Sequence, residues 1–504
     1  MKKNIIVLLS LLFPLSTLAS VIHVPGDQPT IQAGIDAAVN GDTVLVADGT
    51  YTGTGNRDID FLGKAITVRS ENGPDNCIVD CQGSSSDNHR GFYFHNGEGL
   101  DSILQGFTIR NGYVGDGGGI RCDNASPTIH KNIISGNNAN NGGGIHLVDS
   151  SPRITYNNIS GNQGTISFAS SGGGINSYGG SPVIFQNTIT HNGTETLDFY
   201  WGGGIYCTQA SPIIVHNTIT HNISKVDGGG ITLQYCSSTI AHNNISNNSS
   251  YDGGPGGGIF ILFFEDEALP VTINNNIIRD NVSGGGGGGI DCSYGDNSLV
   301  IANNIISSNV AGAAGIYCYE SSPTITNNLI SDIRGPGIQC EYSSSPKITN
   351  NTITNNALGV TPGGGINCDA SSFPTVLNSI IWGNEPGQII GSSTVTYCDV
   401  EGGYPGTGNI DADPLFVRGP LGDYYLSQIS AGQSQDSPCV DSGDGMMSWP
   451  CNSYSVCGTT RTDIEPDTGI IDMGYHYPLV GIQIPTGHKL EEAPEGEAQI
   501  HGIE

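Results

Sequence analysis

The chain has 504 residues, and 75 of them are glycine, about twice the usual glycine share of ~7%. Charged residues make up 13% of the chain, whereas ~25% is usual. Its 17 Lys and Arg against 47 Asp and Glu leave a formal net charge of −30. This balance excludes general binding to nucleic acid and disfavours docking on anionic lipid, because both need cationic side chains. It is compatible with calcium and with carbohydrate.

Residues 1–20 have the pattern of an export signal. Lys2 and Lys3 form a basic start, residues 5–12 are apolar, and Leu18-Ala19-Ser20 offers small residues for cleavage. The apolar stretch is short and Pro14 interrupts it, so a membrane anchor is the less favoured interpretation. No later segment approaches the ~20 apolar residues of a membrane span. We therefore expect a secreted or cell-surface protein with no transmembrane segment after signal removal.

Residues 21–65 are expected to form an N-terminal cap and the first coil of a repeat structure. Within them Ile31, Ile35 and Val39 share one face of a helix. Such a face can close the open end of a solenoid. We therefore predict a short capping helix ahead of the repeats.

A unit recurs along residues 66–400. Each copy reads Gly-Ile-x-(Cys or aliphatic), then a Ser-Ser-Pro-like turn, then Ile-x-x-Asn-x-Ile. Copies 22 to 31 residues apart indicate stacked supersecondary units, and the alternation of apolar and polar residues indicates short strands. We predict an all-β fold, a right-handed parallel β-helix (solenoid) of about 11–13 coils. The leading isoleucines are Ile120, Ile145, Ile175, Ile205, Ile231, Ile259, Ile290, Ile316, Ile338 and Ile366.

One asparagine per unit lies three residues after an inward aliphatic side chain and two before the next. Asparagine at a tight turn tolerates left-handed φ and bonds its own backbone. With coils ~4.8 Å apart, its amide can also bond the copies above and below. We therefore predict a ladder of Asn132, Asn157, Asn187, Asn217, Asn243, Asn276, Asn304, Asn328 and Asn351.

This repeat resembles that of right-handed parallel β-helix proteins of the pectin-lyase-like superfamily, over about residues 21–480. Residues 30–38, followed by Gly41-Asp42-Thr43-Val44, resemble the N-terminal cap of that family. Residues 409–416, 437–441 and 472–474 resemble the C-terminal section of many secreted bacterial members, which implies a β-rich cap over residues 401–480. The fold hosts lyases, hydrolases, epimerases and non-enzymatic surface proteins, so it implies no single activity. Residues 481–504 are expected to form a mobile acidic tail.

Cysteine occurs 13 times. In the Gly-Ile-x-Cys strand isoleucine and cysteine share a parity, so both point inward, where a free thiol acts as a small hydrophobe. The inward row is Cys122, Cys207, Cys292, Cys318, Cys340 and Cys368. Outside the repeats disulfides are an open alternative, with unknown pairing, for Cys77, Cys81, Cys439, Cys451 and Cys457.

Loops of variable length precede the Gly-Ile-x-Cys strand and could wall a groove on its outer face. By resemblance, this is the strand on which pectate-lyase-like enzymes carry their site. Near the N-terminal end, elimination on a uronic acid would need a cation for the carboxylate and a base for the proton. Arg121 could supply the cation and His146 or His95 the base, with Asp123 beside them. The alternative is a surface ion pair between Arg121 and Asp123 with solvated histidines.

Tyrosines and carboxylates along the same face are candidates for substrate binding, because aromatic rings can stack on sugar faces and carboxylates can accept hydroxyl hydrogen bonds. The alternative is the ordinary preference of tyrosine for strands. Toward the C-terminal end Tyr342 joins these candidates. The full set is Tyr93, Tyr178, Tyr206, Tyr317, Tyr319, Glu341 and Asp369.

Several motifs of known chemistry are absent from the sequence. No Asp-Asp pair of polygalacturonase type occurs, the clustered aspartates of calcium-dependent pectate lyases have no clear counterpart, and no Gly-x-Ser-x-Gly, His-Glu-x-x-His or P-loop motif is present. Calcium remains a possible cofactor, since several loop acids offer oxygen ligands, although turn formation explains them equally well. These acids are Asp411, Asp413, Asp441, Asp444, Asp463, Glu465 and Asp467.

The leading hypothesis is a monomeric secreted or cell-surface β-helix protein that engages extracellular polysaccharide or a cell surface, without catalysis and without nucleic acid. The rival hypothesis is a polysaccharide lyase or glycoside hydrolase that acts on a uronic-acid-rich glycan, centred on Arg121. A third interpretation is a purely structural spacer.

Overall fold

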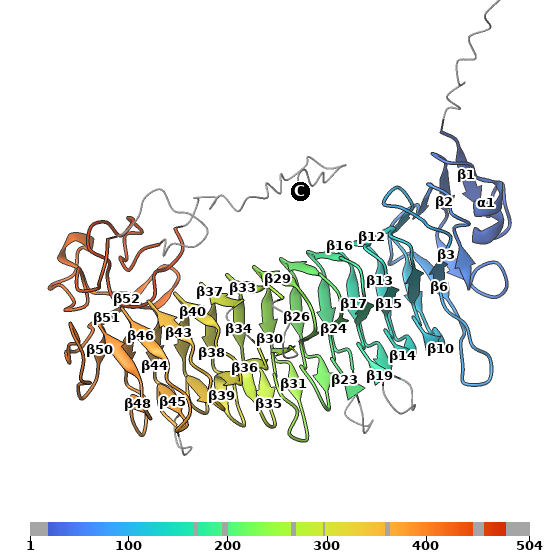
Figure 1. Ribbon diagram of the computed structural model, residues 1–504. Helices are drawn as coiled ribbons and strands as arrows, with labels where there is room; N and C mark the ends of the chain where they lie inside the picture. The colour runs from blue at the N-terminus through green and yellow to red at the C-terminus, as the bar shows by residue number, and fades with distance from the viewer. Residues whose placement is uncertain are drawn as a thin grey trace, which may run out of the picture.

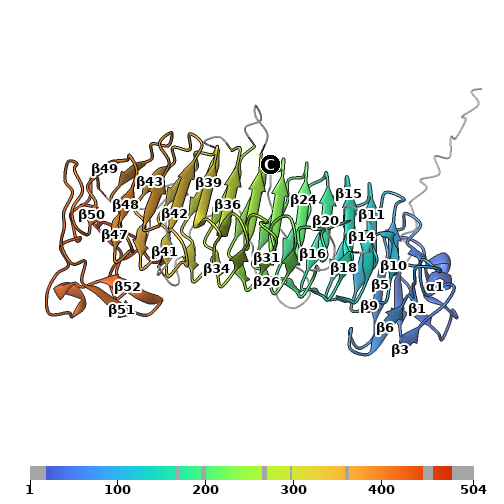
Figure 2. The same cartoon turned by 90° about the horizontal axis from the view of Figure 1, so that it is seen from below.

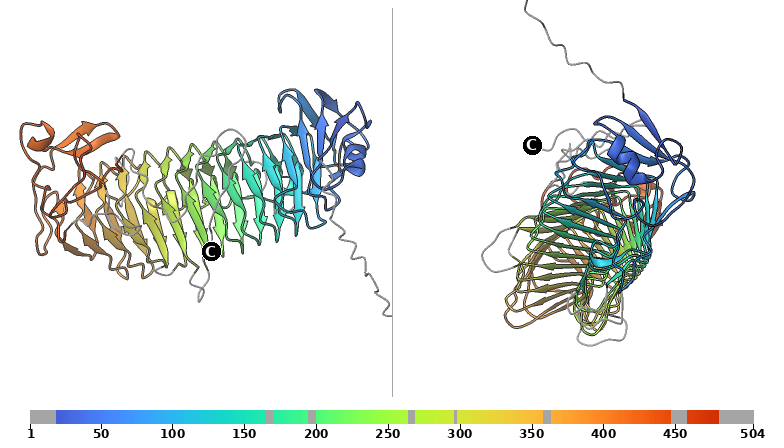
Figure 3. Two further views of the ribbon diagram at one scale, coloured as in Figure 1. Left: turned by 90° about the horizontal axis from the view of Figure 1, so that it is seen from above. Right: turned by 90° about the vertical axis from the view of Figure 1, so that its right-hand side faces the viewer.

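The computed structural model describes residues 19–164, 170–193, 200–263, 269–295, 298–357, 363–446 and 458–479. They form a long solenoid, shown from the side in Figure 1 and nearly along its axis in Figure 3. Most of the expected export signal, the acidic tail, Cys451 and Cys457 lie outside the described residues.

Each regular coil contributes one strand to each of three parallel sheets, which we name A, B and C. Sheet C holds the Gly-Ile-x-Cys strands, and its 13 strands in the described residues agree with the predicted number of coils. The all-β solenoid prediction is therefore confirmed. The short inward runs of isoleucine fit strands because β-branched side chains pack well on a pleated surface.

The strands of sheet A are β1 (Val21–Val24), β2 (Thr43–Val46), β5 (Thr67–Ser70), β8 (Ile103–Gln105), β12 (Thr128–His130), β16 (Arg153–Thr155), β21 (Val183–Phe185), β25 (Ile213–Val215), β29 (Ser238–Ala241), β33 (Val271–Asn274), β37 (Leu299–Ala302), β40 (Thr324–Thr326), β43 (Lys347–Thr349), β46 (Thr375–Leu377) and β49 (Thr394–Thr396). Those of sheet B are β3 (Gly49–Tyr51), β6 (Cys77–Asp80), β9 (Thr108–Arg110), β13 (Ile133–Ser135), β17 (Asn158–Ser160), β22 (Thr188–Thr190), β26 (Thr218–Thr220), β30 (Asn244–Ser246), β34 (Ile277–Arg279), β38 (Ile305–Ser307), β41 (Leu329–Ser331), β44 (Thr352–Thr354), β47 (Ile380–Trp382) and β50 (Asp399–Val400).

Those of sheet C are β4 (Ile59–Asp60), β7 (Phe92–Phe94), β11 (Ile120–Asp123), β15 (Ile145–Val148), β20 (Ile175–Tyr178), β24 (Ile205–Thr208), β28 (Ile231–Gln234), β32 (Ile259–Leu262), β36 (Gly287–Ser293), β39 (Ala314–Tyr319), β42 (Ile338–Glu341), β45 (Ile366–Cys368) and β48 (Ile389–Ile390). Smaller sheets join β10 (Tyr113–Asp116), β14 (Asn138–Asn141), β18 (Gln163–Gly164), β19 (Ser170–Ser171) and β23 (Tyr200–Trp201), then β27 (Ile223–Ser224), β31 (Ser249–Ser250) and β35 (Val282–Ser283).

Two asparagine ladders run along the solenoid. The predicted one forms at the turn between sheets A and B, where each Nδ2 donates to the next Oδ1 at 3.0–3.1 Å, from Asn132 to Asn351. A second ladder, not predicted, follows sheet B from Asn137 to Asn309 with bonds of 3.0 Å. Buried Ile333 interrupts it, and Asn356 with Asn384 resumes it. Each rung satisfies backbone groups that the tight turns leave unpaired.

The helix α1 (Ile31–Ala37) caps the N-terminal end, and the Thr30 hydroxyl accepts the Ala33 N–H at its start. Ile31 and Ile35 are buried as predicted. Val39 is 54% exposed, so its predicted place on the packed helical face is wrong. The helix ends at Ala37 and the backbone turns extended at Ala38, which carries Val39 away from that face.

The C-terminal section packs on the outer face of sheet B rather than across the end of the solenoid (Figures 1 and 2). It contains β51 (Phe416–Gly419), β52 (Gly422–Leu426) and η1 (Ile429–Ala431). Leu329 packs with its tyrosines. The Asn327 side-chain amide accepts the His476 N–H at 2.7 Å and donates to the His476 carbonyl at 3.0 Å. Asn350 and Asn378 donate to its carbonyls in the same way. Among the described residues no helix has the length and apolar character to cross a membrane.

All cysteines of the described residues are free and buried, including the inward row. The disulfide alternative is therefore wrong for Cys77, Cys81 and Cys439. Cys77 and Cys81 both point inward, four residues apart along extended chain. That separation of ~13 Å far exceeds what a disulfide spans.

Candidate functional site

The first outward row of sheet C is largely covered instead of facing an open groove. From β11 to β36 the loop before the strand folds over the residue that follows the leading isoleucine, and a glycine makes the contact. A Cβ at Gly172, where φ is +63°, would lie 2.5 Å from the Ile175 carbonyl oxygen and 2.8 Å from Asn176 Cβ. Only glycine allows this approach without strain. The buried members of the row are His146, Asn176, Tyr206, Thr232, Phe260, Asp291 and Asn367.

Tyr206, which was predicted to bind substrate, lies under this cover. Its ring is 6% exposed and its hydroxyl donates to Gln234 Oε1 at 2.8 Å. Burial raises the pKa of the Tyr206 phenol well above its usual range. A covered ring cannot stack on a sugar, so Tyr206 serves the packing of the loop.

Near the N-terminal end, sheet C brings together an ion-pair cluster. Arg121 lies in register with Tyr93 on one side and with His146 on the other. Its Nε donates to both Asp123 oxygens, at 2.9 and 3.0 Å, and its Nη1 donates to Asp116 at 3.1 Å. Tyr93 Oη donates to Asp123 Oδ2 at 2.6 Å. Two carboxylates therefore already neutralise the guanidinium that the sequence assigned to a uronate.

These contacts keep the cluster in one charge state. Burial is the largest single influence and opposes the charged forms, but the hydrogen bonds and the attraction between opposite charges together outweigh it. The pKa of Arg121 therefore rises and that of Asp123 falls. Burial and the hydrogen bond to Asp123 raise the pKa of Tyr93. At neutral pH, Asp123 is an anion and Tyr93 a neutral donor.

His146 is 7% exposed, and its Nδ1 has no hydrogen-bond partner in the structure. Burial lowers its pKa to about 4, so the imidazole is neutral at pH 7. A chain of hydrogen bonds passes beside it, from Asp116 through Asn141 and Ser171 to Asn176. His146 has the protonation state of a base, but its access to a polymer is restricted.

Arg90 is a member of this cluster that the sequence interpretation missed. Its guanidinium lies 4.7 Å from the Tyr93 ring centroid, and its Nη1 is buried without a partner. His95 stacks on the same tyrosine with centroids 4.0 Å apart and lies 3.8 Å from Asp60. Arg90 lies two residues before β7, at the position that Gly118 occupies before β11 in the next coil. An arginine at a position where the next coil has glycine was the feature of the sequence that could have pointed to it. The catalytic roles of Arg121, His146, His95 and Asp123 remain predictions.

Toward the C-terminal end, four tyrosine rings from three successive coils form what we call the tyrosine surface. Tyr319 contacts Tyr294 at 5.4 Å, Tyr317 at 6.2 Å and Tyr342 at 4.6 Å between ring centroids. Tyr294 is 40% and Tyr342 55% exposed. Tyr294 was not predicted, because it follows the strand in a turn of left-handed φ (+59°) that the strand periodicity does not reach.

Carboxylates border the tyrosine surface. Tyr317 Oη donates to Glu341 Oε2 at 2.7 Å, and Gln339 Nε2 donates to Glu341 Oε1 at 2.5 Å. Asp369 accepts the Tyr342 N–H at 2.8 Å. Burial alone would raise the pKa of Asp369, but this bond and those from Ser371 and Ser372 lower it to about 2. Tyr178 is 48% exposed on β20, several coils away from this cluster.

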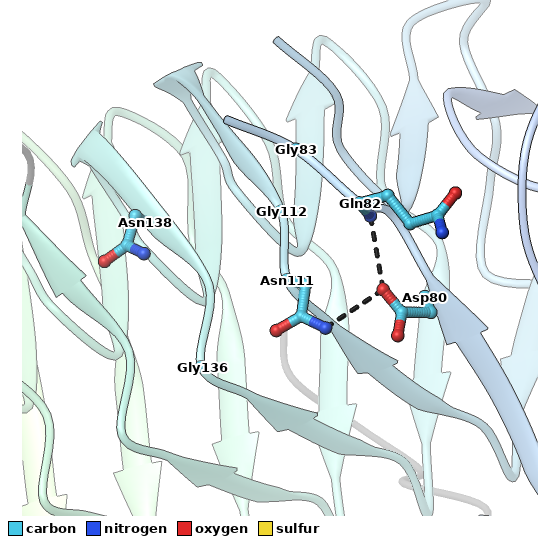
Figure 4. Close-up of a pocket in the computed structure, with 7 residues that line it drawn as sticks. All are labelled: Asp80, Gln82, Gly83, Asn111, Gly112, Gly136 and Asn138. Carbon is cyan, nitrogen blue, oxygen red and sulfur yellow. Dashed lines mark hydrogen bonds between the residues drawn. The ribbon is translucent and has the colours of Figure 1, made fainter. Parts of the chain in front are cut away.

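A shallow polar cavity of about 420 Å³ opens beside the N-terminal coils (Figure 4). Asp80 organises it by accepting the Gln82 N–H and the Asn111 side-chain amide, while Arg110 pairs with it at 3.1 Å. The cavity is therefore neutralised and hydrogen-bonded within itself. It lies beside sheet B and not on the face of sheet C that holds the two clusters.

The loop acids proposed for calcium are occupied in turns. Asp411 and Asp413 accept backbone N–H groups, and Asp463 pairs with Arg461. Within the described ranges no three His, Cys, Asp or Glu side chains gather in a way that could hold a metal ion. The structure therefore adds no support for the calcium prediction.

The family model described as "Right handed beta helix region" matches residues 165–322 and 271–403. Among solved structures, the chain is similar to the periplasmic alginate epimerase AlgG, at 13% identity and TM-score 0.38 over 70% of this chain and 85% of that one. The mannuronan C-5 epimerase AlgE6 A-module of Azotobacter vinelandii matches at 16% identity and TM-score 0.37, over 76% and 94% of the two chains. The pectate lyase Pel9A matches at 15% and 0.34, over 91% and 97%. No relative was found among curated protein sequences.

Proposed function

We propose that this right-handed parallel β-helix is a pectin-lyase-like protein, secreted or at the cell surface, that binds extracellular polysaccharide without catalysis. The observation that carries the proposal is the tyrosine surface. Exposed rings in mutual contact offer a rigid apolar platform for the C–H faces of sugar rings, and fixing them costs little conformational entropy.

The carboxylates beside the rings complete this platform. Glu341 and Asp369 are held by hydrogen bonds, and the pKa of Asp369 is lowered, so the remaining lone pairs of these carboxyl groups can accept sugar hydroxyl groups. An acidic border does not suit an acidic polymer, because like charges repel. The tyrosine surface therefore favours neutral or weakly charged glycans.

The test is retention of the purified mature protein on a panel of insoluble polysaccharides, neutral and acidic. Tyr342→Ala combined with Tyr294→Ala should weaken retention at least about fivefold, since an anchoring side chain in an interface is worth ~1 kcal/mol or more. Tyr251→Ala is the matched control, because Tyr251 is also 40% exposed but lies outside the ring cluster. Equal retention of the double variant and the control would refute the proposal.

A lyase or glycoside hydrolase is the second candidate, and one observation favours it. His146 Nδ1 and Arg90 Nη1 are both buried without partners in one cluster with Arg121, and buried polar groups normally have partners. Turnover on uronate-containing and neutral polymers, with calcium and with chelator, separates the candidates. Reducing ends that rise with the ultraviolet absorbance of unsaturated uronate indicate a lyase, and reducing ends alone a hydrolase. Either result would overturn the non-catalytic proposal.

A further inference from the structure

The outer face of sheet B has no charged side chain over five successive strands, β13, β17, β22, β26 and β30. The first charged residues on this face are Arg110 at one end and Arg279 at the other. A protein with a net charge of −30 thus keeps one continuous uncharged strip. Its outward residues are Ile133, Ser135, Asn158, Ser160, Thr188, Thr190, Thr218, Thr220, Asn244 and Ser246.

The polar groups of this strip form a regular grid. Asn158, Thr188, Thr218 and Asn244 lie in register on adjacent strands, and the residues two positions later form a second column. Strand geometry sets the spacing at ~4.8 Å between coils and ~6.6 Å along each strand. Among the described residues, the side chains of Asn158, Thr188 and Thr218 form no hydrogen bond. The first column therefore presents available hydroxyl and amide groups at a constant repeat. In the second column, the Thr190 hydroxyl lies 3.2 Å from that of Thr220 and 2.8 Å from His191 Nδ1, so these groups bond one another.

Rings border the grid on both sides. On one side Tyr156, Phe185, His216 and His242 form a continuous row with centroids 4.9–6.0 Å apart. On the other side His191 and His221 stack at 4.9 Å with nearly parallel planes. These residues, except Phe185, occupy turns of left-handed φ, at the edges of the strip.

The ring row carries no charge at neutral pH. Burial lowers the pKa of both His216 and His242, so their imidazoles are neutral above their ordinary titration range. Lys131 and Arg153 are charged residues in the coils that begin this row, and Lys131 adds to the lowering of the pKa of neighbouring His130. The strip thus combines neutral ring faces with neutral hydrogen-bonding groups.

We propose that this strip of sheet B is a second carbohydrate site, which takes a neutral polysaccharide chain lying along the solenoid axis. The repeat of the grid matches a polymer that presents the same hydroxyl groups again and again. The ring rows can pack on sugar C–H faces at its edges. The absence of cations on the strip disfavours acidic polymers, which the overall charge repels. The site lies on a different sheet from the tyrosine surface and does not depend on it.

The test is co-sedimentation of the mature protein with insoluble cellulose, chitin and β-1,3-glucan, with alginate and polygalacturonate as acidic comparisons. Thr188→Glu with Thr218→Glu should lower retention on a neutral polymer about tenfold or more, because two carboxylates lose their hydration against an uncharged partner. Thr239→Glu is the matched control, an exposed strand threonine on sheet A. Thr188→Val with Thr218→Val keeps the β-branched shape and removes only the hydroxyls, so it should weaken retention about threefold even if the glutamates disturb folding.

The outcomes separate this site from the tyrosine surface. The double variant Tyr342→Ala, Tyr294→Ala should still be retained on the neutral polymer through the strip of sheet B. The threonine variants should lose this retention. Equal retention of the threonine variants and Thr239→Glu overturns the proposal, as does failure of the wild type to bind any neutral polymer. If the protein shapes growing ice crystals but binds no glycan, the grid binds ordered water rather than sugar. That result also overturns the proposal.

Discussion

Replacing Asn217 with alanine removes one rung from the middle of the first asparagine ladder. Asn217 Nδ2 donates to the Ile184 carbonyl at 2.8 Å, to Val215 at 3.0 Å and to Asn243 Oδ1 at 3.0 Å. Its Oδ1 accepts the N–H and the side-chain amide of Asn187, at 2.9 and 3.1 Å. All these atoms are buried or nearly so, and no water can easily replace the lost amide.

The expected cost follows from the groups left without partners. The Asn187 N–H and the Ile184 carbonyl lose the amide, and a buried polar group left unsatisfied costs ~1–3 kcal/mol. We therefore expect the free energy of unfolding to fall by about 2–5 kcal/mol, a large share of the ~5–15 kcal/mol of an ordinary domain. Because each coil contacts only its neighbours, the loss should be local.

Two measurements check this expectation. Urea unfolding should show the loss relative to Thr239→Ala, an exposed substitution expected to stay within ~0.5 kcal/mol of wild type. Amide hydrogen exchange should accelerate about 30-fold or more in β21, β25 and β29, while β5 and β46 keep their wild-type rates. A loss below ~1 kcal/mol, or uniform acceleration along the solenoid, would refute the assignment of local stability to the ladder.

Three further results are expected. Gly172→Ala should destabilise the fold by about 1–3 kcal/mol more than Gly136→Ala, because both have φ near +64° but only the Cβ at position 172 would meet other atoms within 4 Å. Equal thermal melts for the two variants would contradict this. Burial raises the pKa of Asp227 and Asp291 to about 7, so the stability held by their neutral forms is complete below ~4 and is lost as pH rises through ~7. Asp291→Asn should remove its part of that decline in urea titrations between pH 5 and 8, and an unchanged pH profile would disprove it. Cys77, Cys81 and Cys439 should resist maleimide in the native protein and react fully after denaturation without reductant, as peptide mapping would show; a need for reductant would restore the disulfide alternative.

The sequence predicts the core of this fold well because every coil repeats the same short pattern of inward aliphatic residues and a turn asparagine. The inward isoleucines and the first ladder follow from period-two alternation and from one asparagine per turn, and each depends only on the coils above and below. The second ladder has a similar signal, since Asn137 and its equivalents follow the strands of sheet B at a fixed interval. It was missed because only part of the repeats keep it clearly.

The covering of the outward row was not predictable in the same way. The alternation of apolar and polar residues places His146 and Tyr206 on the outside of sheet C, but it does not predict the loop that folds back over them. That path depends on loop length and, before β11, β15, β20, β24 and β32, on a glycine of left-handed φ. The pairing of Arg121 with Asp116, and the approach of Arg90 to Tyr93, likewise depend on loops that differ from coil to coil.

Ile333 in the second ladder has a mechanical consequence. At Ile333 the second ladder lacks one side-chain rung, and hydrogen bonds of the backbone hold that edge instead. The Arg334 N–H donates to the Asn309 carbonyl at 3.0 Å, and the Ile333 N–H donates to Asn356 Oδ1 at 3.1 Å. The C-terminal section crosses this joint, because Asn327 binds it on one side and Asn350 and Asn378 on the other. It therefore ties together from outside the coils between which the second ladder lacks a rung, and adds to the bending stiffness of the rod at that place.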